Sequence, residues 1–183
     1  MSIVRFITAI IFLFALATSA VAQTEAKSTD ECRKHLPRNW GPNFGEQWHH
    51  YEAIFWACRS GLTTTAVEKL RQTANVTGLI QDMMRVTIDN QELILIGQVE
   101  GSMRCHSFAA LKKTETAWER IWDEASDIYC MMSCPPIRMK VKGTVLILRS
   151  EASSDRQCKG IFHRSEFVWN GKTFERKTSV NGS

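Results

Sequence analysis

An apolar N-terminal segment followed by six cysteines constrains this chain more than any other feature of its sequence. Arg5 precedes an apolar run at 7–17, and Ala20 and Ala22 place small side chains at the two positions that a signal peptidase reads. The apolar run is too short to anchor the chain across a bilayer. We therefore predict a signal peptide at 1–22 and a periplasmic or secreted product without a membrane anchor.

The six cysteines all follow the predicted cleavage site, in a compartment where thiols oxidise. Their even number favours three disulfides, and sequence alone allows fifteen pairings. We expect these bonds to brace the 161 of 183 residues that remain after cleavage. The cysteines are Cys32, Cys58, Cys105, Cys130, Cys134 and Cys158.

The charge of the chain argues against a nucleic-acid partner. The sequence carries 23 basic and 19 acidic residues, and removal of Arg5 with the signal peptide lowers the excess to +3. Domains that bind nucleic acid usually show a strong and concentrated positive charge. We therefore expect a protein or glycan partner in the envelope or outside the cell, and no nucleic acid.

Hydrophobic patterning divides the exported part into an irregular segment and one α+β domain. Residues 23–45 form a polar leader and an irregular stretch, and residues 46–183 form the domain. A helix is predicted over 46–59, because its aromatic residues recur at helical spacing up to Ser60 and Gly61. These aromatic residues are Trp48, Tyr51, Phe55 and Trp56.

Two segments, 64–113 and 115–165, repeat one pattern at an offset of about 52 residues. In each segment a capping-box sequence opens a predicted helix, and an alternating strand, a turn and two further strands follow. The second predicted helix covers 116–132. The apolar runs at 93–96 and 145–148 are typical of central strands covered on both faces. Duplication explains the repeat, and chance convergence on the same pattern is the alternative.

The predicted fold is therefore α+β, with helices packed on one face of an antiparallel sheet of about six to eight strands. An additional hairpin is predicted at 166–178, because Asn170-Gly171 lies between two alternating segments. The layout of two tandem helix–meander units, stapled by disulfides, resembles the secreted proteinaceous inhibitors of β-lactamase. That resemblance implies inhibition of an exported enzyme as one form of function.

The sequence from Cys130 to Pro135, Cys-Met-Met-Ser-Cys-Pro, offers soft sulfur ligands of the kind that select Cu(I). It resembles the Cys-x-x-x-Cys-Pro motif of the Sco-type copper chaperones, in which the motif opens a helix and a distant histidine completes the site. By that resemblance Cys130, Cys134 and His163 would bind the metal. In this chain the motif instead closes a predicted helix.

The other interpretation is that Cys130 and Cys134 form separate structural disulfides. Cysteines four residues apart on one helical face do not easily bond to each other. Their partners would then be Cys158 and either Cys32 or Cys58.

Catalytic signatures are absent from the sequence, which contains neither a Gly-x-Ser-x-Gly elbow nor a phosphate-binding glycine loop. His49 and His50 lack the i, i+4 spacing of a zinc pair and indicate a solvated helix face. Trp40 and Trp169 lie next to turns and are the predicted binding residues. We interpret the chain as an exported, disulfide-stabilised, non-enzymatic binding protein without a cofactor, either inhibitor-like or an envelope partner. The alternative is a protein that handles copper.

Overall fold

A computed structural model describes residues 22–23, 27–38, 47–100, 105–130, 138–152 and 161–182. Most of the predicted signal peptide, and also Trp40, Cys134 and Cys158, lie outside these ranges. The described elements are β1 (Ala22–Gln23), α1 (Thr29–Arg33), α2 (Gln47–Ser60), α3 (Thr64–Thr73), β2 (Leu79–Ile88), β3 (Gln91–Glu100), β4 (Cys105–Lys113), β5 (Trp118–Cys130), β6 (Arg138–Lys142), β7 (Val145–Ala152), β8 (Ile161–Trp169) and β9 (Phe174–Gly182).

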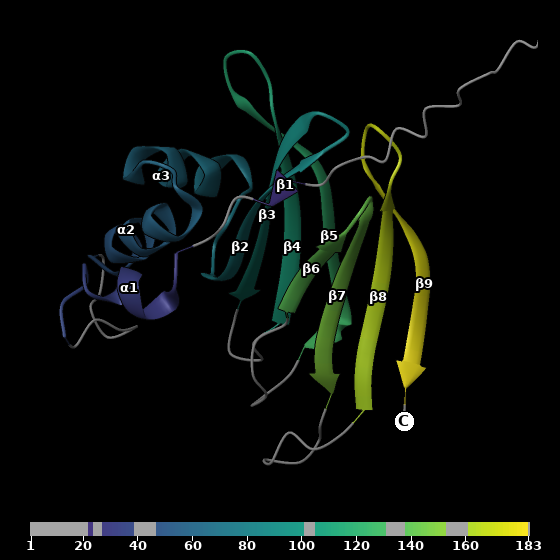
Figure 1. The fold of residues 1–183 in the computed structure, drawn as a ribbon. Coiled ribbons are helices and arrows are strands. Elements are labelled where there is room, and N and C mark those ends of the chain that lie inside the picture. The colour runs from purple at the N-terminus through teal and green to yellow at the C-terminus, as the bar shows by residue number, and fades with distance from the viewer. Residues whose placement is uncertain are drawn as a thin grey trace, which may run out of the picture.

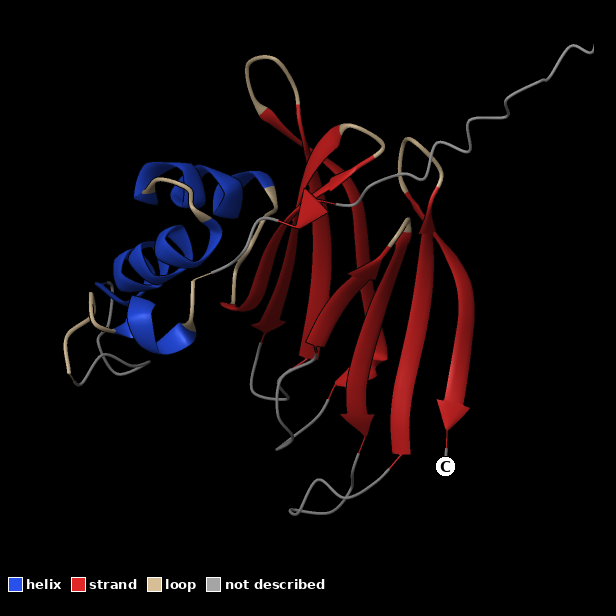
Figure 2. Cartoon of the chain, in the orientation of Figure 1, coloured by secondary structure: helices blue, strands red, loops and turns tan. Residues whose placement is uncertain are grey.

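These elements form three layers (Figures 1 and 2). The first sheet has the strand order β1-β2-β3-β4-β5, the second has the order β6-β7-β8-β9, and all neighbouring strands are antiparallel. The helices lie on the side of the first sheet that faces away from the second sheet. The mixed α+β class is confirmed, but the strands form two sheets where the sequence predicted one.

The first sheet is buried on both faces, as β3 shows. Leu93 and Leu95 belong to the core between the two sheets, whereas Ile94 and Ile96 belong to the core beneath the helices. All four side chains are at most 1% exposed. The prediction of a central strand covered on both faces is therefore confirmed for residues 93–96.

The described elements cover the equivalent strand of the second sheet, β7, on one face only. Leu146 and Leu148 are fully buried between the sheets, while Val145 and Ile147 are half-buried on the outer face. No described helix lies over that face, because all three pack beyond the first sheet. The prediction of coverage on both faces is therefore wrong for residues 145–148.

The prediction of a second helix over 116–132 is also wrong, because residues Trp118–Cys130 form strand β5. Between Ala110 and Leu111 of β4, the register with β5 shifts by one residue, which is a β-bulge. The extra residue reverses the alternation, so that Trp118 packs on the helix-side core and Ile121 and Trp122 pack on the core between the sheets. Spacings of three and four residues then imitate the period of a helix.

Each sheet contains a four-stranded meander in the same chain order, β2 to β5 and β6 to β9. Since β5 replaces the second helix, the predicted units 64–113 and 115–165 are not both helix–meander units. The hairpin predicted at 166–178 is found as β8 and β9, and its turn holds Gly171 at a φ of 92°. The oxygen of the Asn170 side chain accepts the N–H groups of Lys172 and Thr173, both at 2.9 Å. Duplication stays a prediction, for which the two meanders are the units to compare.

A disulfide between Cys32 and Cys58 joins α1 to α2. Helix α1 lies in the segment predicted to be irregular, and it begins after Ser28, whose side chain accepts the N–H of Glu31 at 3.1 Å. The bond rules out the predicted pairing of Cys130 or Cys134 with either of these two cysteines. Among the helices that the structure describes, none has both the length and the apolar character needed to cross a bilayer.

Replacement of both Cys32 and Cys58 by alanine should lower the free energy of unfolding by about 3–4 kcal/mol. The bond closes a loop with a sequence separation of 26, and opening that loop restores entropy to the unfolded chain. Denaturant unfolding of the variant and the parent, both without reductant, measures the difference. An unchanged unfolding midpoint would contradict a stabilising role for this bond.

Candidate functional site

The candidate site lies where α2 and α3 meet the end of β2 that has no neighbouring strand. β1 pairs with β2 only at Val86 and Thr87, so nothing in the described chain continues the sheet beside Ile80. Helix α2 supplies the missing partners. Glu52 Oε1 accepts the N–H of Ile80 at 2.7 Å, and Trp56 Nε1 donates to the carbonyl of Ile80 at 3.2 Å. Two helix side chains therefore satisfy a buried strand edge.

Glu52 is 3% exposed and forms an ion pair with Arg71 of α3. Arg71 also donates from Nη2 to the carbonyl of Gly78 at 2.7 Å, which fixes the connection from α3 into β2. Helix α3 begins after Thr63, whose hydroxyl oxygen accepts the N–H of Ala66 at 3.1 Å. A buried charge needs a partner and further hydrogen bonds, and this arrangement provides both.

Burial raises the pKa of Glu52 to about 7, while Arg71 and the N–H of Ile80 act in the opposite direction. The ring of His49 lies nearby, with 4.0 Å between its Nδ1 and Glu52 Oε2. Its own burial and then Arg71 lower the pKa of His49. Shifted pKa values in a cleft often mark acid–base sites. Here both oxygens of Glu52 already bind protein groups, which indicates a positioning role.

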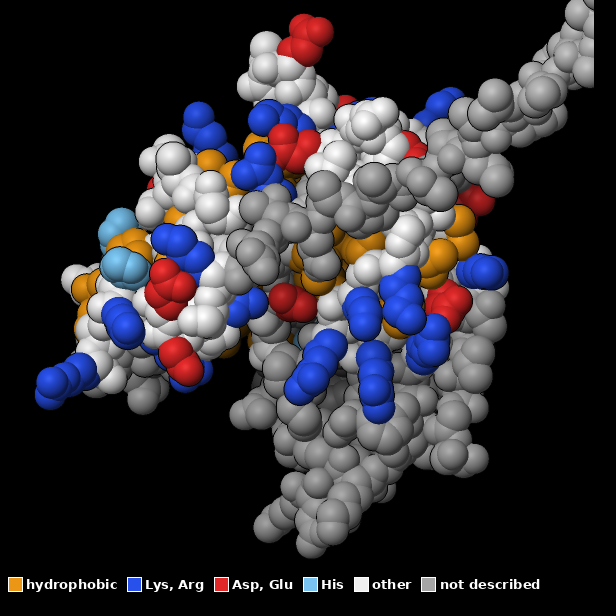
Figure 3. All heavy atoms as spheres, viewed as in Figure 1, with side chains coloured by type: hydrophobic (Ala, Val, Ile, Leu, Met, Phe, Trp, Pro, Cys, Tyr) orange, Lys and Arg blue, Asp and Glu red, His pale blue; other side chains and the backbone are white. Residues whose placement is uncertain are grey.

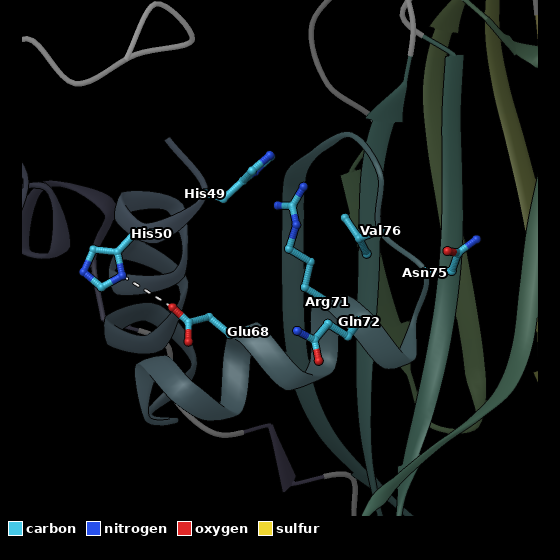
Figure 4. Close-up of a pocket in the computed structure, with 7 residues that line it drawn as sticks. All are labelled: His49, His50, Glu68, Arg71, Gln72, Asn75 and Val76. Carbon is cyan, nitrogen blue, oxygen red and sulfur yellow. Dashed lines mark hydrogen bonds and ion pairs between the residues drawn. The ribbon is translucent and has the colours of Figure 1, made fainter. Parts of the chain in front are cut away.

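A polar pocket of about 360 Å³ opens between α2 and α3 (Figure 4). His50 and Glu68 face each other from the two helices, with 3.4 Å between Nδ1 and Oε1. The lining residues include no hydroxyl, thiol or amine that could act as a nucleophile. They are His49, His50, Glu68, Arg71, Gln72, Asn75 and Val76. The side chains of His49 and His50 are 54% and 61% exposed, as expected for a solvated histidine face.

A second hollow, the aromatic groove, has a volume of about 440 Å³ and runs between α1, α2 and β2. Trp48 and Phe55 provide apolar surface, and Arg33 and Arg59 provide positive charge. The groove is lined by Thr29, Arg33, Trp48, Glu52, Phe55, Trp56, Arg59, Leu79, Ile80, Gln81 and Asp82. Glu52 lines this groove and its partner Arg71 lines the polar pocket, so the ion pair lies between the two hollows.

The walls of the aromatic groove are fixed by the disulfide and by one hydrogen bond. Cys32–Cys58 ties α1 to α2, and Arg59 Nη1 donates to Thr29 Oγ1 at 2.6 Å across the same interface. Arg59 Nε and Gln81 Oε1 are buried polar atoms of the lining that have no hydrogen-bond partner within the described chain. Buried polar atoms usually find partners, so this donor and this acceptor mark a place where a ligand can bind.

Asp82 closes the groove at the β2 side and also joins the two sheets. Its Oδ2 accepts the N–H of Met139 of β6 at 3.3 Å. The register of β2 with β3 shifts between Ile80 and Asp82, and bulges of this kind redirect side chains. Burial raises the pKa of Asp82, against the effects of the Met139 N–H and of Arg59.

Of the two binding residues predicted from the sequence, the structure describes Trp169 alone, and this residue does not lie at the candidate site. Trp169 is 4% exposed and packs between the sheets against Phe174, so it cannot be a surface binding residue. Its position next to a turn gave no information on which way the ring points. Trp40 lies outside the described residues.

The metal alternative gains no ligand from the described residues. Cys130 ends strand β5 where a helix end was predicted, and the side chains of Cys130 and His163 are not described. In the described part of the chain no three His, Cys, Asp or Glu side chains converge in a way that could hold a metal ion.

Glu52 is the site residue that the sequence analysis missed, although a signal was present. It follows Trp48 by four residues and precedes Trp56 by four, so it falls on the apolar face of the predicted helix. A carboxylate on an apolar face is buried, and buried carboxylates are paired.

Comparisons of this chain with protein-family models, with curated proteins and with solved structures find no match. The site must therefore be interpreted from its own chemistry.

The raised pKa of Glu52 predicts a specific dependence of stability on pH. Between pH 4.5 and about 7 the folded protein holds a proton that the unfolded chain has lost, so stability falls as the pH rises through this window. The contribution amounts to at most about 3 kcal/mol, since one pKa unit corresponds to about 1.4 kcal/mol. Glu52→Gln removes this contribution, and denaturant unfolding across the window measures it.

The matched control is Glu115→Gln, which changes an exposed carboxylate in the turn between β4 and β5. The control should keep the pH dependence of the parent protein. If Glu52→Gln keeps it as well, the pKa of Glu52 is not raised in the folded protein.

Proposed function

We propose that this chain is an exported, disulfide-stabilised binding protein that acts without catalysis on another protein in the envelope or outside the cell. The observation that carries the proposal is the aromatic groove. It combines apolar rings, positive charge, covalently fixed walls and two polar atoms that lack partners in the described chain. Aromatic and arginine side chains of this kind dominate protein-binding hot spots.

The carboxyl groups near the groove support binding rather than catalysis. Glu52 accepts the N–H of Ile80 and pairs with Arg71, and Asp82 accepts the N–H of Met139. A general acid or base must exchange its proton with a substrate. If Glu52 exchanged its proton with a substrate, it would lose its contact with the edge of β2. If Asp82 did so, it would lose the contact that joins the two sheets.

The polar atoms of the groove fit a peptide segment. Arg59 Nε can donate to a backbone carbonyl, and Gln81 Oε1 can accept a backbone N–H. Trp48 and Phe55 can then cover an apolar side chain of the same segment. A protein therefore fits better than a glycan, and an inhibited enzyme or an envelope partner would supply such a segment.

Export and further disulfides belong to the same proposal. The Cys32–Cys58 bond is compatible with an oxidising compartment. Cys105 of β4 and Cys130 of β5 occupy facing register positions in the first sheet. We expect them to form the second bond, which would leave Cys134 and Cys158 as the third pair.

Photo-crosslinking tests the groove directly. A benzophenone amino acid at position 48 should yield one dominant protein adduct in the compartment where the chain resides, and the same amino acid at the exposed turn residue Lys172 should not. Excess unlabelled parent protein should suppress the adduct. An unlabelled protein carrying Arg59→Ala and Gln81→Ala should suppress it about tenfold less well, because two hydrogen bonds are lost. Equal suppression by both proteins would refute binding in the groove.

Thiol counting separates this proposal from copper handling. The natively isolated protein should contain no free thiol, and digestion should give a linked peptide pair with Cys105 and Cys130. Two free thiols, together with Cu(I) uptake that is lost in Cys134→Ser, would instead support the copper alternative.

A further inference from the structure

The outer face of the second sheet carries a row of basic side chains. In β6, Met139 and Val141 are buried in the core between the sheets, and the alternating residues Arg138, Lys140 and Lys142 are exposed on the other face. The same alternation places Arg149 of β7 and Arg164 of β8 outward. We call these five residues, Arg138, Lys140, Lys142, Arg149 and Arg164, the basic face.

Three of these residues are direct neighbours across the sheet. Arg138 faces Arg149 in the β6–β7 register, and Arg149 faces Arg164 in the β7–β8 register. Adjacent strands lie about 4.8 Å apart, so three guanidinium groups share one short row. Basic side chains gather over β6, β7 and β8 in the space-filling view (Figure 3).

Protection of a sheet edge explains only part of this arrangement. Lysine and arginine on an edge strand prevent pairing with other chains, and β6 is an edge strand. Arg149 and Arg164 lie on β7 and β8, which have neighbours on both sides. Edge protection therefore does not account for these two residues.

Few acidic groups offset the charge of the basic face. Glu166 pairs with Arg164, and Glu175 accepts a hydrogen bond from Asn170 at 2.6 Å. Among the five residues of the basic face, the described carboxylates pair only with Arg164.

Aliphatic side chains lie between the basic ones. Val145, Ile147 and Val168 share the outer face and are half-buried, and Val145 faces Val168 across the sheet. The described part of this surface presents no aromatic ring on which a base could stack, which disfavours single-stranded nucleic acid. A surface of cations and small aliphatic groups that no described element covers suits the headgroup region of an anionic bilayer.

We propose that the basic face docks the protein on an anionic lipid surface. All three helices lie beyond the first sheet, so the aromatic groove is on the other side of the molecule from this face. A protein held in this way keeps the groove accessible from solution. Docking on lipid is thus independent of what the groove binds.

Vesicle co-sedimentation tests the proposal. The isolated protein should bind vesicles of equal parts phosphatidylglycerol and phosphatidylcholine, and should not bind phosphatidylcholine alone. Binding should weaken strongly between about 0.1 and 0.5 M NaCl, because salt screens exposed charges. All variants share one N-terminus, so the apolar segment at 7–17, if it is retained, contributes equally to each.

The decisive variant is Arg138→Gln with Arg149→Gln. Each basic residue near an anionic surface changes the affinity about fivefold, so the double variant should bind roughly 25-fold more weakly. The charge-matched control, Lys34→Gln with Lys69→Gln, changes two exposed lysines on the helical side and should bind like the parent. Thermal unfolding of both variants verifies that they fold.

Three results would overturn the proposal. They are equal binding to phosphatidylcholine alone, equal losses in the two double variants, and tighter binding of duplex DNA than of anionic vesicles. The last result would assign the basic face to nucleic acid. Crosslinking from position 48 reads out the groove separately, so failure of one proposal leaves the other intact.

Discussion

The structure depends on a helix that takes the place of a missing strand. Ile80 lies at the end of β2 that β1 does not reach, and without α2 its N–H and carbonyl would be unpaired and buried beneath the helices. Glu52 and Trp56 of α2 satisfy these two groups. This contact fixes α2 on the first sheet, Arg71 then fixes α3, and the disulfide fixes α1. Both hollows of the candidate site are consequences of this arrangement.

The two meanders differ in what covers them, and this difference separates their roles. The first sheet is an inner layer, so its strand β3 is apolar on both faces. No described element covers the outer face of the second sheet, so the same strand order tolerates Arg149 on β7 and Arg164 on β8. The described helices lie on one side only, which gives a groove on that side and leaves a charged sheet surface on the other. The net charge of the whole chain does not show this difference between the side with the groove and the side with the basic face.

Sequence patterns predicted α2, the α+β class and the strands of the hairpins β2–β3, β6–β7 and β8–β9. Each of these features depends on local alternation or on helical spacing. The patterns could not predict β5, since a bulge at Ile121 shifts its aromatic residues to helix-like spacing. Nor could they show that Trp169 points inward, because a turn does not reveal which face of its hairpin is covered. The burial of Glu52 could have been predicted from the sequence, because a carboxylate on the apolar face of a helix requires a partner. That the partner is the edge of β2 depends on tertiary contacts that no local pattern contains.

A carboxyl with a raised pKa can have one of two roles in a folded protein, and the bonding of Glu52 and Asp82 distinguishes them. In an acid–base site the carboxyl is left free for a substrate, whereas a structural carboxyl is committed to groups of the protein. Glu52 and Asp82 are both shifted mainly by burial, and each accepts a backbone N–H from a strand, Ile80 and Met139 respectively. Each carboxyl stands where a strand neighbour is lacking or where two sheets meet. The raised pKa of each carboxyl therefore reflects its burial in the scaffold. Arg59 Nε and Gln81 Oε1 are polar atoms of the groove that a ligand can still bind.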